Sequence, residues 1–339
     1  MAETPSEPPA AVLLRLIGGY RVTQALYVVT KLGIPDRIAL EPKDAESLAR
    51  ETGTHPQRLF RVLRALASVG VLAMDETSRF GLTDMGRLLT TDSKGSLAAP
   101  ALFAGEEAYR AWGDLLHSVR TGETAFDHVY GMGHFDYLGQ HPEASALFNR
   151  LMASSVGWEG DPLAGYDLER HHVLVDVGGG KGVLIAQALR SFPRLEGILF
   201  DQSSALTEAP EVLRAAGVAE RCRIIAGSAF DGVPPGGDVY VMSRILHDWP
   251  DEKAARLLAN CRKVMAPGAV LLLVDGVLPE GVPPPSRAWL DLVMLAVTGG
   301  RERTEKEWRG LLREAGFELT GFRPVRANQD LIEARAVAL

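Results

Sequence analysis

The chain has 339 residues, a length that suggests two domains and ample volume for hydrophobic cores. Its net charge of −7 at pH 7 argues against a nucleic-acid partner. Two cysteines, Cys222 and Cys261, are too few and too far apart for a disulfide framework or a thiolate metal site, and no other metal-ligand spacing is evident.

Residues 1–10 are rich in Pro, Glu and Ser, and they lack the basic and apolar regions of a signal peptide. This composition predicts a disordered tail. No stretch of the chain approaches the length of a membrane span, so no membrane partner is expected. A cytoplasmic protein is the default expectation.

Residues 11–95 are predicted to form an N-terminal domain that begins with two apolar helices, at 11–17 and 20–32. Gly18 and Gly19 break the pattern between them. Their apolar residues are too many for a single helical stripe. A partner subunit could bury the surplus, and burial inside the same subunit is an equal alternative.

Within that domain, residues 44–90 have the pattern of a winged helix. Two helices are expected at 45–51 and 57–68, followed by a hairpin around the polar turn 75–78. Winged helices often bind DNA, and Arg58, Arg61 and Arg64 lie on the second helix. The acidic chain favours the alternative, a solvated basic face on a fold that serves dimer contacts.

Residues 96–165 are predicted to be a helical, aromatic-rich connector. Most of its aromatic side chains are expected in ordinary core. A few could line an apolar pocket for a flat substrate, since ligand pockets are largely apolar with few polar groups.

From residue 166 to residue 339 predicted strands and helices alternate, which indicates an α/β domain with a Rossmann-like, mostly parallel sheet. Strands are expected near 172–178, 196–201, 222–227, 238–243 and 269–275. The segments 317–325 and 331–336 read as a terminal antiparallel hairpin. Ligands of such sheets bind outside the carboxyl ends of the strands.

The most informative stretch, residues 173–183, reads V-L-V-D-V-G-G-G-K-G-V. A buried strand ends in glycines, which allow a ligand to approach the backbone, and a helix follows. Val183 stands where a dinucleotide fingerprint needs glycine. Asp201 closes the next apolar run and could accept both ribose hydroxyls of an adenosine. Adenosylmethionine therefore fits better than NAD, and the alternative is a tight turn that binds no ligand.

A second candidate site follows the fourth and fifth strands. His247 comes after one strand, Asp275 ends the next, and Glu302 precedes Thr304, a predicted helix cap. A histidine flanked by carboxylates forms a general base, because an acid holds the tautomer and stabilises imidazolium. The alternatives are a structural histidine and a solvated Glu302.

Four motifs together carry a resemblance: F-N-R-L-M at 148–152, V-D-V-G-G-G at 175–180, L-H-D-W at 246–249 and G-G-R-E-R-T at 299–304. Over nearly its whole length the chain resembles the S-adenosylmethionine-dependent O-methyltransferases of the plant caffeate type and their bacterial phenazine and polyketide relatives. The resemblance implies a class I methyltransferase sheet behind a winged-helix dimerisation domain. It also implies methyl transfer to a hydroxyl, usually phenolic, of a small molecule. The apolar helices of residues 11–32 and the winged segment predict a homodimer with the N-terminal region in its interface.

The resemblance also assigns roles by position. It makes His247 the catalytic base, with Asp275 and Glu302 as its flanking acids. The implied S-adenosyl-L-methionine contacts are Gly178, Gly180, Asp201, Ser228, Ala229, Ser243 and Trp249. The implied substrate contacts are Phe148, Met152 and Met294. Three positions depart from the plant members, which have Asp at 228, Lys at 243 and Glu at 275.

Other functions remain open at this point. Some relatives keep the fold but carry out decarboxylation or hydroxylation. A dehydrogenase-type enzyme and a winged-helix regulator that senses a ligand are further hypotheses. The glycine spacing disfavours the dehydrogenase, the charge disfavours the regulator, and His247 with both acids favours methyl transfer.

Overall fold

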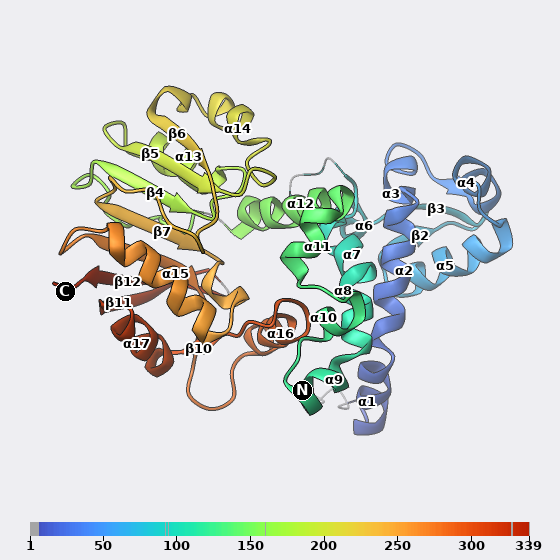
Figure 1. The fold of residues 1–339 in the computed structure, drawn as a ribbon. Coiled ribbons are helices and arrows are strands. Elements are labelled where there is room, and N and C mark those ends of the chain that lie inside the picture. The colour runs from blue at the N-terminus through green and yellow to red at the C-terminus, as the bar shows by residue number, and fades with distance from the viewer. Residues whose placement is uncertain (1–6, 92, 94, 160, 327, 339) are drawn as a thin grey trace, which may run out of the picture. The chain divides into compact units, whose positions relative to one another are not determined.

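The computed structural model describes residues 7–91, 93, 95–159, 161–326 and 328–338. The chain divides into two compact units, Met1–Tyr109 and Arg110–Leu339 (Figure 1). The helices of the expected connector, 96–165, are shared between these units. Each unit is described by itself.

The first unit is mainly helical. Its two leading helices break at Gly18, as the glycine pair predicts. The first begins at Pro9, so residues 9 and 10 of the expected tail are helical, whereas residues 1–6 lie outside the described residues. Proline suits this position because the first helical N–H needs no partner. The helices are α1 (Pro9–Ile17), α2 (Gly19–Lys31), α3 (Ile34–Arg37), α4 (Ala45–Thr52), α5 (Pro56–Ser68), α6 (Asp84–Arg87), α7 (Ala98–Gly105) and α8 (Glu107–Gly113), the last of which crosses the boundary.

The predicted winged-helix elements are present. The side chain of Asp44 caps α4 by accepting a 2.7 Å hydrogen bond from the Ser47 amide, and α4 ends at Gly53, whose φ is +65°. Helix α5 buries Leu59, Leu63 and Leu66 in the core of this unit. The hairpin of β2 (Leu72–Met74) and β3 (Arg79–Leu82) gains a third antiparallel strand, β1 (Lys43–Asp44), which the sequence pattern did not indicate.

The excess apolar side chains of α1 are exposed on the surface of the single chain. Leu13, Leu14, Leu16 and Ile17 are all more than half exposed, and α1 buries no residue. In the described part of the chain, no single helix is long and apolar enough to cross a membrane. Helices α1 and α2 meet that length and composition only as a pair, with a bend of 41° between them.

The second unit is built on a seven-stranded sheet with the order β11-β12-β8-β7-β4-β5-β6. The five strands from β4 to β8 are parallel, while β12 is antiparallel to both β8 and β11. This agrees with the predicted parallel sheet and terminal hairpin. The strands are β4 (Val173–Val177), β5 (Glu196–Asp201), β6 (Cys222–Ala226), β7 (Val239–Ser243), β8 (Val270–Asp275), β11 (Phe317–Arg326) and β12 (Gln329–Ala336).

Helices cover both faces of this sheet. Side chains alternate along each strand, so Val239 and Val241 of β7 join one core while Tyr240 and Met242 join the other. Helices α13 (Val183–Ser191) and α14 (Ala209–Ala215) pack in the first core, and α15 (Asp251–Val264) and α17 (Glu305–Glu314) in the second (Figure 1). Burial on both faces explains why these strands read as continuous apolar runs.

The strand order changes direction at β4. The chain passes from β4 to β5 and β6 on one side and then crosses to β7 on the other. A crevice at the carboxyl ends of β4 and β7 is the expected ligand site of such a sheet. The remaining helices of this unit are α9 (Leu115–Thr121), α10 (Ala125–Tyr130), α11 (His134–Gln140), α12 (Pro142–Glu159), α16 (Pro285–Val293) and the π-helix η3 (Met294–Thr298).

A short parallel pair, β9 (Val277–Leu278) with β10 (Arg303–Thr304), was not foreseen from the sequence. Its register sets Arg303 opposite Val277. Glu302 is thereby brought beside the segment that follows β8, although it is 27 residues from Asp275 in the chain.

Candidate functional site

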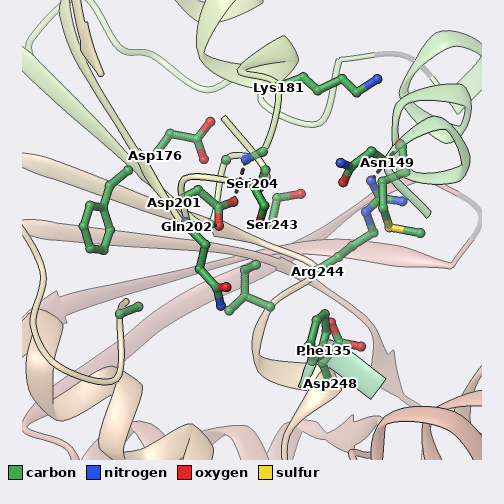
Figure 2. A pocket seen from close by; sticks show the side chains of 18 of the residues that line it. Phe135, Asn149, Asp176, Lys181, Asp201, Gln202, Ser204, Ser243, Arg244 and Asp248 are labelled. Carbon is green, nitrogen blue, oxygen red and sulfur yellow. Dashed lines mark hydrogen bonds between the residues drawn. The ribbon is translucent and has the colours of Figure 1, made fainter. Parts of the chain in front are cut away.

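A cavity of about 260 Å³ lies at the carboxyl ends of β4, β5 and β7 (Figure 2). Asp176, Asp201 and Gln202 lie toward one end of it, and Phe135 and Asp248 toward the other. All of its lining residues belong to the second unit. Its position is that of the crevice expected from the strand order.

The glycine turn forms one wall of the cavity. Gly178 has a φ of +75°, and a Cβ there would overlap the side chain of Ile245. Gly180 has a φ of +54° and no neighbour near the position of a Cβ, so its backbone is open to a ligand. Its amide donates a 2.8 Å hydrogen bond to Oδ2 of Asp201. The turn and the predicted ribose acceptor are therefore held together.

Two acids share this end of the cavity. Burial raises the pKa of Asp201, against hydrogen bonds from the Gly180 and Gln202 amides that lower it. Burial, reinforced by the neighbouring Asp201 charge, raises the pKa of Asp176 to about 7. Among the described residues, Oδ2 of Asp176 has no hydrogen-bond partner. A buried acceptor on a cavity wall is suited to a donor supplied by a ligand.

Aromatic side chains form the opposite wall. Trp249 meets Phe230 edge-on at 4.8 Å between ring centroids and lies 5.1 Å from Phe135. All predicted cofactor contacts line the cavity, namely Gly178, Gly180, Asp201, Ser228, Ala229, Ser243 and Trp249. Phe148 and Met152 line it too. Met294 does not line it and is buried in η3.

His247 lies in a short 3₁₀ turn, Leu246–Asp248, directly after β7. Its Nδ1 is 2.8 Å from Oε1 of Glu302 and 3.7 Å from Oδ1 of Asp275, so only Glu302 is within hydrogen-bond distance. The structure therefore brings the three predicted catalytic residues together. The ring is nearly buried and is not part of the cavity lining, whereas the adjacent Asp248 is.

The cluster changes the acidity of its members. Burial opposes charging of His247, but Asp275, Asp248 and Glu302 together outweigh it and raise the pKa of the imidazolium to about 9. Burial raises the pKa of Asp275 to about 7, although the nearby imidazolium lowers it. Neither carboxylate oxygen of Asp275 has a hydrogen-bond partner among the described residues. Asp275, which is shorter than the Glu of the plant members at this position, therefore acts on His247 through its charge and makes no hydrogen bond to the ring.

The G-G-R-E-R-T motif forms the support for His247. A Cβ on Gly300 would overlap the carbonyl of His247, and the Arg301 amide donates a 2.8 Å hydrogen bond to that carbonyl. The fully buried Arg303 donates to the carbonyls of Leu246, at 2.9 Å, and Trp249, at 2.8 Å. Thr304 caps α17 in a capping box with Glu307, as its position predicted.

The cavity fits S-adenosyl-L-methionine in its chemistry. The open backbone at Gly180, the carboxylates of Asp176 and Asp201 and the aromatic wall at Trp249 offer what a ribose, an ammonium group and an adenine ring each require. Asp201 ends β5 and Ser228 follows β6, so they can contact separate parts of one extended molecule. A mostly parallel sheet with this strand order, an antiparallel β12 beside β8 and a glycine turn after β4 is the fold of a class I methyltransferase.

Comparison with known proteins gives the family. Residues 112–318 match the O-methyltransferase domain and residues 14–92 match the O-methyltransferase dimerisation domain. The chain belongs to this O-methyltransferase family. It is 43% identical to the phenazine O-methyltransferase of Lysobacter antibioticus, a match that covers 97% of each chain. Like its relatives, it is an S-adenosylmethionine-dependent methyltransferase.

Two further similarities concern the ligands and the acceptor atom. A solved O-methyltransferase from neocarzinostatin biosynthesis, in complex with S-adenosylmethionine and 2-hydroxy-5-methyl naphthoic acid, is 30% identical; the match covers 93% of this chain and 96% of that one, with a TM-score of 0.84. The 8-amino-8-demethylriboflavin N,N-dimethyltransferase of Streptomyces davaonensis is 34% identical over 100% of each chain. Family members thus methylate oxygen or nitrogen of aromatic natural products.

Sequence reasoning assigned no role to several residues that line the cavity. Asp176 and Asp248 lie next to predicted residues, and their acidic side chains in otherwise apolar segments were the available signal. Arg244 has a φ of +56°, unusual for a residue with a side chain, and donates a 3.1 Å hydrogen bond to the Met152 carbonyl. No sequence pattern indicated that contact, because it joins β7 to α12 across 92 positions.

Proposed function

We propose that the protein transfers the methyl group of S-adenosyl-L-methionine to a phenolic hydroxyl of a small aromatic natural product, with His247 as the general base. The observation that carries the proposal is the buried cluster of His247, Glu302 and Asp275 beside a cavity suited to the methyl donor. Bound there, the donor supplies an electrophilic methyl group. The residues of this chain then have to orient the acceptor and take up its proton.

The hydrogen bonds support Nε2 as the ring nitrogen that takes the proton. Because Nδ1 of His247 faces Glu302, Nε2 is the atom left to act on a substrate. Nε2 is 4.0 Å from Oδ1 of Asp248, which lines the cavity. A hydroxyl that enters beside Asp248 would therefore come close to Nε2.

The raised pKa of His247 suits this role. A free phenol has a pKa of about 10, and an ordinary histidine has a pKa of about 6.5. Proton transfer between those two values is uphill, whereas a histidine pKa of about 9 nearly matches the phenol. Only the neutral imidazole accepts the proton, and this form becomes abundant as the pH approaches 9. The charges of Asp275 and Asp248 and the hydrogen bond to Glu302 account for this match, since all three acids stabilise the imidazolium.

Positioning contributes more than the base. Proper alignment of the acceptor oxygen with the donor methyl is worth roughly 7–11 kcal/mol, whereas general-base catalysis gives about 10²–10⁴-fold. We assign the positioning of the aromatic ring to Phe148 and Met152 on α12 and to Phe135 on α11, which line the cavity. Met294 is buried in η3 and does not line the cavity, so it would support the substrate pocket indirectly, through packing.

We further propose that the protein is a homodimer. The exposed apolar residues Leu14, Leu16 and Ile17 of α1 lie within the segment that matches the dimerisation domain, and a second copy would bury them. Sedimentation of a stable monomer at micromolar concentration would contradict this proposal.

The experiment for the activity is methyl transfer to a matched panel of phenols, aromatic amines and aromatic N-heterocycles, with product masses and fragmentation identifying the methylated atom. We expect methyl ethers from phenols and none from the corresponding O-blocked compounds. Products methylated only on nitrogen would instead place the chain with its N-methylating relatives. Adenosylhomocysteine, and not NAD, is expected to raise the melting temperature.

A further inference from the structure

An acid on helix α16 (Figure 1) has no part in the donor site or in the proton transfer described above. Asp291 is flanked on both sides by apolar residues, in the sequence W-L-D-L-V at 289–293. It is partly buried and does not line the cavity. No lysine, arginine or histidine among the described residues forms an ion pair with it, so a charge partner does not explain an acid in this apolar segment.

The partner of Asp291 is the backbone of Glu302. The Glu302 amide donates a 2.8 Å hydrogen bond to Oδ1 of Asp291. This bond closes a loop of the chain, residues 291–302, which contains η3 and the turn at Gly299, whose φ is +76°. Hydrogen bonds to a carboxylate are shorter and stronger than those between neutral groups. Asp291 therefore fixes the point from which the Glu302 side chain leaves the backbone.

The carboxylate of Glu302 has few other restraints. Its Oε1 is 2.8 Å from Nδ1 of His247, whereas Oε2 has no hydrogen-bond partner among the residues that the structure describes. A Cβ on Gly276 would overlap Oε2, so the carboxylate has its space because residue 276 is a glycine. Functional side chains keep their geometry when packing and further hydrogen bonds support them. For Glu302 that support has to come through its backbone.

We infer that Asp291 is a positioning residue, which accepts the Glu302 amide and thereby holds the Glu302 carboxylate against Nδ1 of His247. The inference rests on the proposed role of His247 as the base. The same loop carries the Arg301 amide, which donates to the His247 carbonyl, so one segment supports both members of the pair. The π-helix η3, which continues α16, packs against the turn that contains His247.

The position of Glu302 affects how strongly the imidazolium of His247 is stabilised. The groups that shift the pKa of this ring, together with the two cations that act on them, are Asp275, Asp248, Glu302, Arg303 and Arg244. Asp291 is not among them, so its own charge does not act directly on the ring. Loss of the acceptor oxygen should therefore lower the pKa of His247 by displacing Glu302, whereas loss of the charge alone should leave that pKa unchanged.

NMR titration of the imidazole signals in the histidine-labelled full-length protein tests the inference without a substrate. The signals of His247 are identified by their absence from the spectrum of His247→Asn. We expect the His247 titration to move to lower pH in Asp291→Ala, and also in Asp291→Leu, which fills the space without an acceptor. Asp291→Asn retains an acceptor oxygen and is expected to titrate like the wild type. The matched control is Asp231→Ala, which removes an exposed acid outside the base cluster.

Turnover provides the second readout. The kcat of Asp291→Ala is expected to fall about five- to ten-fold, the usual effect of losing one hydrogen bond, and that of Asp291→Asn to stay within about two-fold. Adenosylhomocysteine is expected to bind all variants alike, because Asp291 does not line the cavity, and this binding shows that they are folded.

An unchanged His247 titration in both Asp291→Ala and Asp291→Leu would overturn the inference, as would an equal shift in Asp291→Asn. Wild-type turnover by His247→Asn would instead contradict the proposed base. The two failures are distinguishable, because the NMR titration reports the position of Glu302 whether or not His247 takes part in the reaction.

Discussion

The two ends of the cavity region are built in different ways. At the donor end, Gly178, Gly180 and Asp201 are joined by local backbone geometry and by one hydrogen bond between a turn and the next strand. At the base end, His247, Asp275 and Glu302 come from three separate segments and meet as buried, interacting charges. The donor end is specified by conformation, and the base end by electrostatics.

In the proposed mechanism this difference makes donor binding and proton transfer separable, with Asp248 as the residue that both lines the cavity and acts on His247. The atoms that a Cβ would meet at the glycines of the turn belong to residues outside the base cluster, and Asp201 is not among the groups that shift the pKa of His247. Substitutions at one end should therefore leave the other intact. The predictions below use that separation, starting with the largest expected effect.

His247→Asn is expected to reduce turnover by about 10²-fold or more, the usual contribution of a general base. Binding of adenosylhomocysteine is expected to remain within about two-fold, because His247 does not line the cavity. Steady-state methyl transfer and calorimetry on the same preparation measure both quantities. If the variant turned over at the wild-type rate, His247 would be structural and positioning alone would perform the chemistry.

Asp201→Ala is expected to weaken adenosylhomocysteine binding by about 1–3 kcal/mol, the cost of leaving buried polar groups unpaired. The loss has two sources, since Asp201 also holds the Gly180 amide. Asp231→Ala is the matched control, because its side chain is 83% exposed and does not line the cavity. Equal calorimetric affinities for the two variants would remove Asp201 from the donor site.

Much of the donor end was predictable from the sequence. The continuous apolar run before Gly178 and the acid at the end of β5 are local patterns, and β5 has the predicted bounds, 196–201. Such patterns can be read from the sequence because a strand buried on both faces is apolar at nearly every position, and a turn with positive φ favours glycine. All the cofactor contacts implied by resemblance consequently lie on one cavity.

The base end was less predictable. Two-residue strands such as β9 and β10 have no periodicity, so the pairing that brings Glu302 to His247 has no sequence signal. The exclusion of Met294 from the lining depends on how η3 packs, which is a tertiary property. The hydrogen bond of His247 to Glu302 but not to Asp275 likewise depends on differences of about 1 Å.

The two acids around His247 provide a finer test. Glu302→Gln is expected to lower turnover about ten-fold, because it replaces a charge-assisted hydrogen bond with a neutral one. Asp275→Asn is expected to cost only a few-fold, since Asp275 makes no hydrogen bond to the ring. Both variants are compared by kcat under saturating donor. A larger loss in Asp275→Asn than in Glu302→Gln would mean that charge outweighs hydrogen bonding in this cluster.

A smaller expected effect is a shift of the pH profile. A general base must be neutral, so kcat/KM is expected to rise with pH up to about 9, the pKa of His247, and not to level off near 6.5. In Asp275→Asn the rising part of the kcat/KM profile is expected to move to lower pH, because one of the charges that stabilise the imidazolium is removed. A profile that is unchanged in this variant would show that Asp275 does not act on His247.

The same titration has a consequence for stability. The pKa of His247 is raised from about 6.5 in the unfolded chain to about 9 in the folded protein. Its stabilising contribution is therefore fully present below pH 6.5 and is lost as the pH rises through 9. We expect the melting temperature to fall more steeply over this window in the wild type than in His247→Asn, as measured by calorimetric scans. Parallel curves would contradict a charged His247, and the base would then have to work from an ordinary pKa.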